Sequence, residues 1–108
     1  MTEIIDVDAK EGFDIIKNNP DIIILDVRTP MEFESERIKG AINLDMYSNI
    51  FRNNLDKLDK SQTIFLYCRT DSRSNHSKNI FIELGFKKIY HLEEGILGWM
   101  ASGLSVES

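Results

Sequence analysis

The sequence has little of what would place it in several large classes of protein. Its 108 residues include one cysteine, two prolines and two histidines. One cysteine cannot form an internal disulfide, and with the distant His76 and His91 it does not have the spacing of metal ligands. We therefore expect neither a metal nor another cofactor. The thiol of Cys68 is then either a small buried apolar group or a reactive one.

Long apolar runs and an excess of basic charge are also missing. No run approaches the roughly 18 apolar residues of a membrane span, and the start "MTEIIDVDAKEGFD" is acidic where a signal peptide is basic. The net charge of −5 gives no general attraction to nucleic acid or to an anionic membrane. We therefore expect a cytoplasmic protein that binds neither, and the oligomeric state stays open.

The chain does contain short apolar runs that alternate with segments of helical period. Ile22–Leu25 and Thr63–Tyr67 are continuous and rich in β-branched or aromatic residues, which is typical of central strands buried on both faces. Shorter runs with polar flanks, expected at the sheet edges, are Ile4–Asp6, Ala41–Asn43 and Lys88–His91. With 42 % apolar residues, the pattern predicts one α/β domain over residues 1–108.

The intervening segments repeat their apolar residues at helical spacing. The repeating residues are Ala9, Phe13 and Ile16; Tyr47, Ile50, Phe51, Leu55 and Leu58; and Ser77, Phe81 and Leu84 before Gly85. A further short helix is expected to begin at Pro30, with Thr29 as its cap, because proline in the first turn sacrifices no needed donor. Each predicted helix has one apolar side.

The stretch "FLYCRTDSRSNHS" places the only thiol at a strand-to-helix junction. Cys68 follows the predicted strand Thr63–Tyr67, and ligands of open α/β sheets bind at the carboxyl ends of strands. Backbone N–H groups at the start of the next helix favour an anion, by about 0.3–1 kcal/mol from the dipole. Arg69 and Arg73 add positive charge. Guanidinium groups suit anion binding, so this setting favours a nucleophilic thiolate over an inert core thiol.

Three separated motifs resemble the rhodanese domain, a sulfurtransferase fold, and together they extend over nearly the whole chain. "ILDVRTPMEFESERIKGAINL" resembles the segment with Asp-Val-Arg, Glu-Phe and an Ile-x-Gly-Ala-Ile-Asn turn. "YCRTDSRS" resembles the loop with a cysteine and four residues before an arginine, and "LEEGILGW" resembles the closing motif. The resemblance implies an α/β domain with a parallel five-stranded sheet and helices on both faces.

The resemblance also implies an activity. Cys68 would take a sulfane sulfur from thiosulfate or a persulfide, hold it as a persulfide and pass it to cyanide, a small thiol or the thiol of a sulfur-relay protein. The implied binding loop consists of Arg69, Thr70, Asp71, Ser72, Arg73 and Ser74. Within it, Arg69 and Arg73 would hold the anionic donor.

Residues outside the loop are expected to support it. Asp26 and Arg28 would brace the loop through ion pairs without taking part in the chemistry. Glu32 would pair with Arg28 or Arg37, and Phe33 would pack into the core. Trp99 is expected to be a packing anchor.

One loop residue departs from the family pattern. Asp71 replaces a small residue, often glycine, and its carboxylate would repel an anionic donor. A side chain there would be strained if the backbone needed a positive φ. We therefore expect a preference for a less anionic donor, such as a persulfide, over thiosulfate. Two smaller departures are Arg37, where histidine is common, and Glu94, where glycine is common.

Two other functions remain as alternatives. A cysteine-loop phosphatase or arsenate reductase resembles a cysteine with five residues before its arginine, whereas only four separate Cys68 from Arg73. The smaller ring fits a single sulfur atom better than a tetrahedral oxyanion. A rhodanese-like sulfur carrier or interaction module with little turnover is the other alternative.

Overall fold

The computed structural model describes all residues from 1 to 108 and contains one parallel five-stranded sheet. The strands are β1 (Glu3–Val7), β2 (Ile23–Asp26), β3 (Ile42–Asn43), β4 (Thr63–Tyr67) and β5 (Lys88–Leu92), in the order β1-β5-β4-β2-β3. The helices are α1 (Ala9–Asn18), α2 (Pro30–Ser35), α3 (Phe51–Asp56), α4 (Ser72–Leu84) and α5 (Gly95–Ala101). The predicted α/β class is confirmed, and so is the five-stranded parallel sheet.

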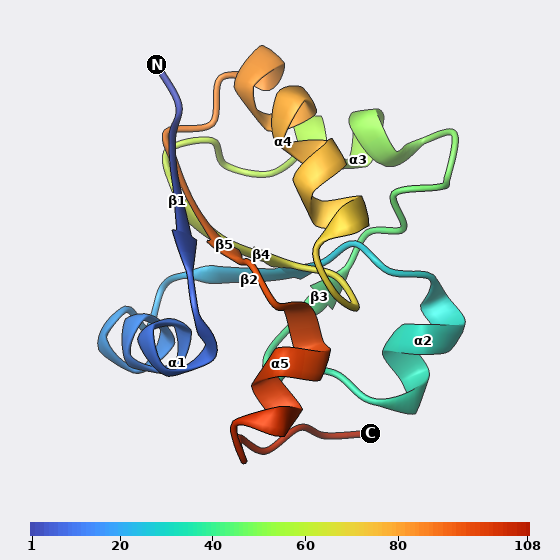
Figure 1. The fold of residues 1–108 in the computed structure, drawn as a ribbon. Coiled ribbons are helices and arrows are strands. Elements are labelled where there is room, and N and C mark those ends of the chain that lie inside the picture. The colour runs from blue at the N-terminus through green and yellow to red at the C-terminus, as the bar shows by residue number, and fades with distance from the viewer.

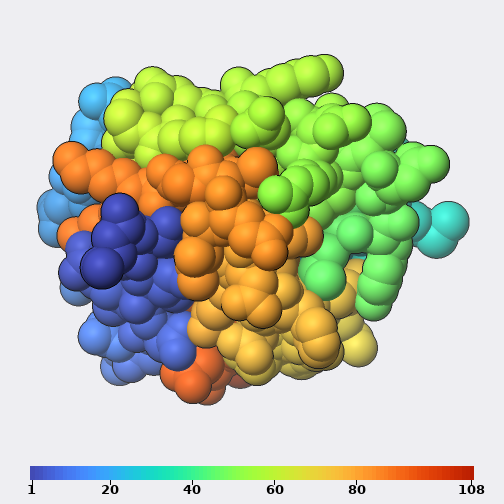
Figure 2. Space-filling view, turned by 90° about the horizontal axis from the view of Figure 1, so that it is seen from above, coloured from blue at the N-terminus to red at the C-terminus, as the bar shows by residue number.

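Helices cover both faces of this sheet. Figure 1 shows α1 and α5 on one face and α3 and α4 on the other, with α2 beside the edge. In the space-filling view, the segment that contains α3 (green) lies directly against α4 (orange) (Figure 2). The two layers bury two apolar clusters, one on each side of the sheet. Such coverage on both faces explains why the central strands read as continuous apolar runs.

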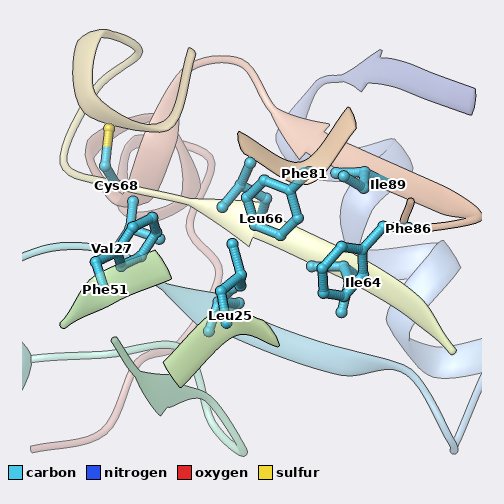
Figure 3. Close-up of a cluster of buried hydrophobic side chains, with 10 residues drawn as sticks. Leu25, Val27, Phe51, Ile64, Leu66, Cys68, Phe81, Phe86 and Ile89 are labelled. Atoms are coloured by element: carbon cyan, nitrogen blue, oxygen red, sulfur yellow. The ribbon is translucent and has the colours of Figure 1, made fainter. Parts of the chain in front are cut away.

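Alternation along β4 decides which face each side chain enters. Ile64, Leu66 and Cys68 belong to the cluster under α3 and α4, and Phe65 and Tyr67 belong to the cluster under α1 and α5. Figure 3 shows Cys68 at the end of this row, with its sulfur pointing toward the loop that leads into α4. The period of two residues in a strand therefore aims the thiol at the start of α4.

Two predictions about the elements were wrong. β5 is not an edge strand, because it pairs with β1 on one side and with β4 on the other. The helix expected from Tyr47 begins only at Phe51. The side chain of Asp45 accepts the N–H of Tyr47 at 2.9 Å, which folds this segment into a turn instead.

The cap of α2 is as predicted, but its packing is not. Thr29 accepts the N–H of Glu32, and Pro30 occupies the first turn. Phe33 was expected in the core; it is only partly buried and lies under the guanidinium of Arg37, 5.0 Å from its ring centre. Trp99 is buried and packs near Phe13 and Phe65, as expected of a packing anchor. No helix in the structure is both long enough and apolar enough to cross a membrane.

Candidate active site

Cys68 lies where β4 ends, at the centre of the sheet. The residue is only 1 % exposed, and its carbonyl oxygen accepts the N–H of Ile96 at 3.0 Å. The sulfur receives the N–H of Ser74 at 3.3 Å and lies 3.2 Å from the Ser74 hydroxyl. An amide at the start of α4 therefore points at the sulfur, which is the arrangement that stabilises a thiolate.

The loop between Cys68 and α4 is closed tightly around the thiol. The thiol also lies 3.5 Å from the carbonyl oxygen of Thr70. Gly95 packs directly against the carbonyl groups of Arg69 and Thr70 at a φ of +66°, so any side chain there would overlap the loop. Thr70 and Ser72 have exposed side chains. The backbone of this loop thus screens Cys68 from solvent.

Arg73 does not point freely into the site. Its guanidinium donates to both carboxylate oxygens of Glu32, at 2.5 and 2.8 Å. Hydrogen bonds from Arg73 lower the pKa of Glu32 to about 2, and the same contact raises the pKa of Arg73. The expectation that Glu32 pairs with Arg28 or Arg37 was wrong. The reason is that Arg73 lies in the first turn of α4, close enough to α2 for its guanidinium to bind the Glu32 carboxylate with two hydrogen bonds.

The two remaining charged loop residues are exposed. Arg69 makes no hydrogen bond or ion pair through its side chain. Asp71 precedes α4 with a φ of −114° and is 52 % exposed, and no residue other than glycine has a positive φ. Asp71 therefore fits without the backbone strain considered from the sequence. Its Oδ1 lies 3.8 Å from Nε2 of His91.

Asp26 and Arg28 form a buried pair that makes no hydrogen bond to the loop. Both residues are at most 1 % exposed, and Nη2 of Arg28 donates to Oδ2 of Asp26 at 2.7 Å. Arg28 also donates to Glu36, just beyond α2. The expectation that this pair braces the loop directly was wrong, because its hydrogen bonds join β2 to the end of α2. Removing one partner of such a buried pair costs about 3–5 kcal/mol.

Sequence reasoning missed two residues behind the thiol. His91 is fully buried, and its Nε2 lies 2.7 Å from the Ser74 hydroxyl while its Nδ1 lies 2.9 Å from Oδ1 of Asp6. The signal was present in the strand period. His91 follows Ile89 by two residues and Asp6 follows Ile4 by two, and both isoleucines pack in the same cluster as Cys68. The side chains of Asp6, His91 and Cys68 therefore all lie on the face of the sheet that α4 covers.

A shallow hollow of about 240 Å³ lies beside the loop. Its walls are Met46, Tyr47, Ser72, Arg73 and His76. The guanidinium of Arg73 also lies over the ring of Tyr47, 5.7 Å from its centre. Ser72 and Arg73 of the loop line this hollow, but Cys68 does not.

The fold and this loop define an α/β domain with a cysteine at the end of its central strand. The model of the rhodanese-like domain matches residues 4–102, and the chain belongs to that family. It is 32 % identical over 91 residues to a thiosulfate sulfurtransferase GlpE of Coxiella burnetii, and the match covers 84 % of this chain and 82 % of that protein. The suspected resemblance is thereby confirmed.

Other similarities are broader. A tRNA uridine(34) hydroxylase of Legionella pneumophila is 34 % identical over 90 residues, which cover 78 % of this chain but only 35 % of that protein. A rhodanese-related protein from Thermoplasma volcanium superposes with a TM-score of 0.82 at 24 % identity, covering 95 % of this chain and 97 % of the other. The family therefore includes proteins named for different reactions, and the structural similarity concerns the fold.

Proposed function

We propose that the chain is a sulfurtransferase that carries a sulfane sulfur as a persulfide on Cys68. The observation that supports it best is the position of the sulfur. It lies at the carboxyl end of the central strand and accepts the Ser74 N–H at 3.3 Å, at the start of a 13-residue helix. The same donors would stabilise the outer sulfur of a persulfide, whose negative charge lies one bond farther out.

The proposed transfer has two steps. The Cys68 thiolate attacks the sulfane sulfur of the donor, a new S–S bond forms, and the donor's own S–S bond breaks. With thiosulfate, sulfite leaves with the bonding electron pair. In the second step a thiolate or cyanide attacks the outer sulfur, and the electron pair returns to Cys68. Splitting the transfer into two displacements is ordinary covalent catalysis.

The charges around the loop favour a weakly charged donor. Arg73 is neutralised by Glu32, so Arg69 is the remaining unpaired loop cation and Asp71 is a nearby carboxylate. These two opposite charges largely cancel for a dianion such as thiosulfate. A small-molecule or protein persulfide carries less negative charge and meets less repulsion from Asp71. We propose such a persulfide as the better donor.

The burial of Cys68 favours a second candidate function. At 1 % exposure, the thiol reacts only when the loop at 69–71 moves outward. A sulfur carrier that opens on contact with a partner protein, and turns over little by itself, would have this property. The partner in that case supplies or receives the sulfur through its own thiol.

Mass spectrometry after donor treatment tests the proposal. Thiosulfate, a persulfide and mercaptopyruvate are each added to the native chain and to Cys68→Ser, and the mass is measured without reductant. We expect a gain of one sulfur atom in the native chain and none in Cys68→Ser. In a separate sample, iodoacetamide shows whether Cys68 can be reached by a reagent. If Cys68 is alkylated there but gains no sulfur from any of the three donors, the proposal is contradicted.

Turnover separates the candidates. An enzyme transfers sulfur to cyanide or a small thiol repeatedly, whereas a carrier gains one sulfur and releases it only to a partner thiol. An aryl phosphate serves as the contrasting substrate. Its hydrolysis by the native chain, lost in Cys68→Ser, would favour a phosphatase instead.

A further inference from the structure

Behind Cys68 lies a continuous chain of polar groups that sulfur transfer alone does not explain. His91 and Asp6 are register partners in the ladder between β5 and β1, and Nδ1 of His91 lies 2.9 Å from Oδ1 of Asp6. On its other side, Nε2 lies 2.7 Å from the hydroxyl of Ser74. That hydroxyl lies 3.2 Å from the sulfur of Cys68.

Most of the groups in this hydrogen-bonded series are buried, unlike those of a network at the protein surface. Cys68, Ser74 and His91 are each at most 1 % exposed, while the Asp6 side chain is 45 % exposed. The line of contacts therefore runs from the buried sulfur to a carboxylate that meets solvent. Buried polar groups are costly unless paired, and here every member has a partner.

The donor and acceptor roles follow from Asp6. An ionised carboxylate only accepts, so Nδ1 of His91 carries a proton. Burial lowers the pKa of His91, against the opposing effect of Asp6, and favours the neutral ring. The Ser74 hydroxyl has one proton and two acceptors in reach, Nε2 of His91 at 2.7 Å and the carbonyl oxygen of Asp71 at 3.1 Å. In the shorter contact it donates to Nε2, and its oxygen then accepts from the Cys68 thiol, which also lies 3.5 Å from the carbonyl oxygen of Thr70. All the hydrogen bonds then run in one direction, from sulfur to Asp6.

We propose that Cys68 loses its proton through Ser74 to His91, with Asp6 holding the ring in position. The S–H bond breaks as a new O–H bond forms on Ser74, and the original Ser74 proton moves to Nε2 of His91. The electron pair stays on sulfur, and the imidazolium lies next to the Asp6 carboxylate. After the transfer, Nε2 of His91 donates to the Ser74 hydroxyl oxygen, and that hydroxyl donates to the sulfur. Nδ1 still donates to Asp6.

The inference rests on Cys68 being the nucleophile of the proposed function and adds the residue that accepts its proton. Ser74 touches the reacting sulfur, His91 takes up the proton through Ser74, and Asp6 is a positioning residue that acts through His91. The order serine, histidine, aspartate is also that of hydrolases. Here, however, the Ser74 hydroxyl lies between His91 and the sulfur of Cys68, at 2.7 and 3.2 Å, so it links the ring to the thiol.

Four charged or titratable groups face the imidazole. The carboxylates of Asp6 on β1 and Asp71 at the start of α4 favour the protonated ring. The ammonium group of Lys78 on α4 disfavours it and lies 3.0 Å from Oδ1 of Asp6. Cys68 is the fourth, linked through Ser74. The thiol and the imidazole are therefore expected to titrate as a coupled pair.

A thiolate titration tests the relay without requiring sulfur transfer. The ultraviolet absorbance of the thiolate is followed against pH in the native chain, His91→Gln and Ser74→Ala, with Cys68→Ser as the blank. We expect the midpoint to move up by on the order of one pH unit in both variants. The exposed His76→Gln is the matched control and should leave it unchanged. Superimposed titrations for the native chain and His91→Gln overturn the proposal.

A second measurement tests the relay even if the His91 or Ser74 variant does not fold. The imidazole nitrogens of His91 are followed by NMR against pH in the native chain and in Cys68→Ser. The relay requires a neutral ring with its proton on Nδ1, and loss of the thiol should shift its titration to lower pH. A proton on Nε2 of the neutral ring, or identical titrations in the two proteins, overturns it.

The outcomes also separate this inference from the proposed function. A shifted thiolate titration with no persulfide from any donor supports the relay and contradicts sulfur transfer. Persulfide formation with an unshifted titration supports sulfur transfer and contradicts the relay.

Discussion

Arg73 at the start of α4 donates both guanidinium arms to the carboxylate of Glu32 on α2, at 2.5 and 2.8 Å. The side chains are 17 % and 29 % exposed, so the contact is partly screened by protein. Oε1 of Glu32, which accepts one of the two hydrogen bonds from Arg73, also accepts the N–H of Thr29 and completes the cap of α2. One carboxylate therefore joins the cap of one helix to the first turn of another, next to the Cys68 loop.

Replacing Glu32 with glutamine should weaken this junction without destroying the cap, because glutamine still accepts from Thr29. We expect the free energy of unfolding at pH 7 to fall by about 1–2 kcal/mol. The measurement is urea denaturation. Glu83→Gln is the matched control, because its pair with Arg52 is more than half exposed on both sides and should contribute less than about 0.5 kcal/mol.

The same pair should make stability depend on acid pH. The pKa of Glu32 is lowered from 4.5 to about 2 by Arg73, so its contribution is present above pH 4.5 and lost as pH falls toward 2. The difference in stability between the native chain and Glu32→Gln should shrink over that interval. A difference that stays constant from pH 5 to about pH 2 would show that the charge on Glu32 is not what stabilises the junction.

The two loop arginines should respond differently to substitution. Arg69 has no partner, so Arg69→Gln should raise the KM for thiosulfate by about 3–10-fold and leave the stability unchanged. Arg73→Gln should lower the stability instead, because it breaks the contact with Glu32. Steady-state kinetics and urea denaturation are measured on both. An unchanged KM in Arg69→Gln would mean that this cation does not bind the donor.

Asp71 should weaken the binding of an anionic donor. Its backbone is already in the right-handed region, so Asp71→Asn changes the charge with little change in conformation, and Asp71→Gly adds flexibility as well. We expect the KM for thiosulfate to fall several-fold in Asp71→Asn and the KM for a less charged persulfide to change little. Glu93→Gln, an exposed carboxylate outside the loop, is the control. The donor preference argued above would be wrong if thiosulfate kinetics are identical in the native chain and both Asp71 variants.

Local patterns were enough to place Cys68. The run Thr63–Tyr67 became β4 with the same bounds, because its apolar residues fill both faces of the sheet. Cys68 then had to follow at the strand end. Pro30 and Thr29 likewise defined the start of α2, since caps depend on residues three positions apart.

Partners that are distant in sequence could not be predicted in the same way. Asp6 and His91 are 85 positions apart and meet because β1 pairs with β5, a register that no local signal specifies. Arg73 and Glu32 are 41 positions apart, and only the position of α2 beside the start of α4 brings them together. The interior place of β5 was missed because one of its polar residues, His91, is paired inside the protein.

Gly95 should be the least replaceable residue around the loop. Its φ of +66° disfavours any side chain, and a Cβ would overlap the carbonyl groups of Arg69 and Thr70. Gly103 is the matched control, because it has a φ of +82° with open space around it. Gly103→Ala should cost about 1–2 kcal/mol from the backbone conformation alone. We expect Gly95→Ala to cost at least about 2 kcal/mol more and to slow persulfide formation on Cys68. Urea denaturation and mass spectrometry check both effects, and equal losses of stability in the two variants would show that the loop yields to the added methyl group.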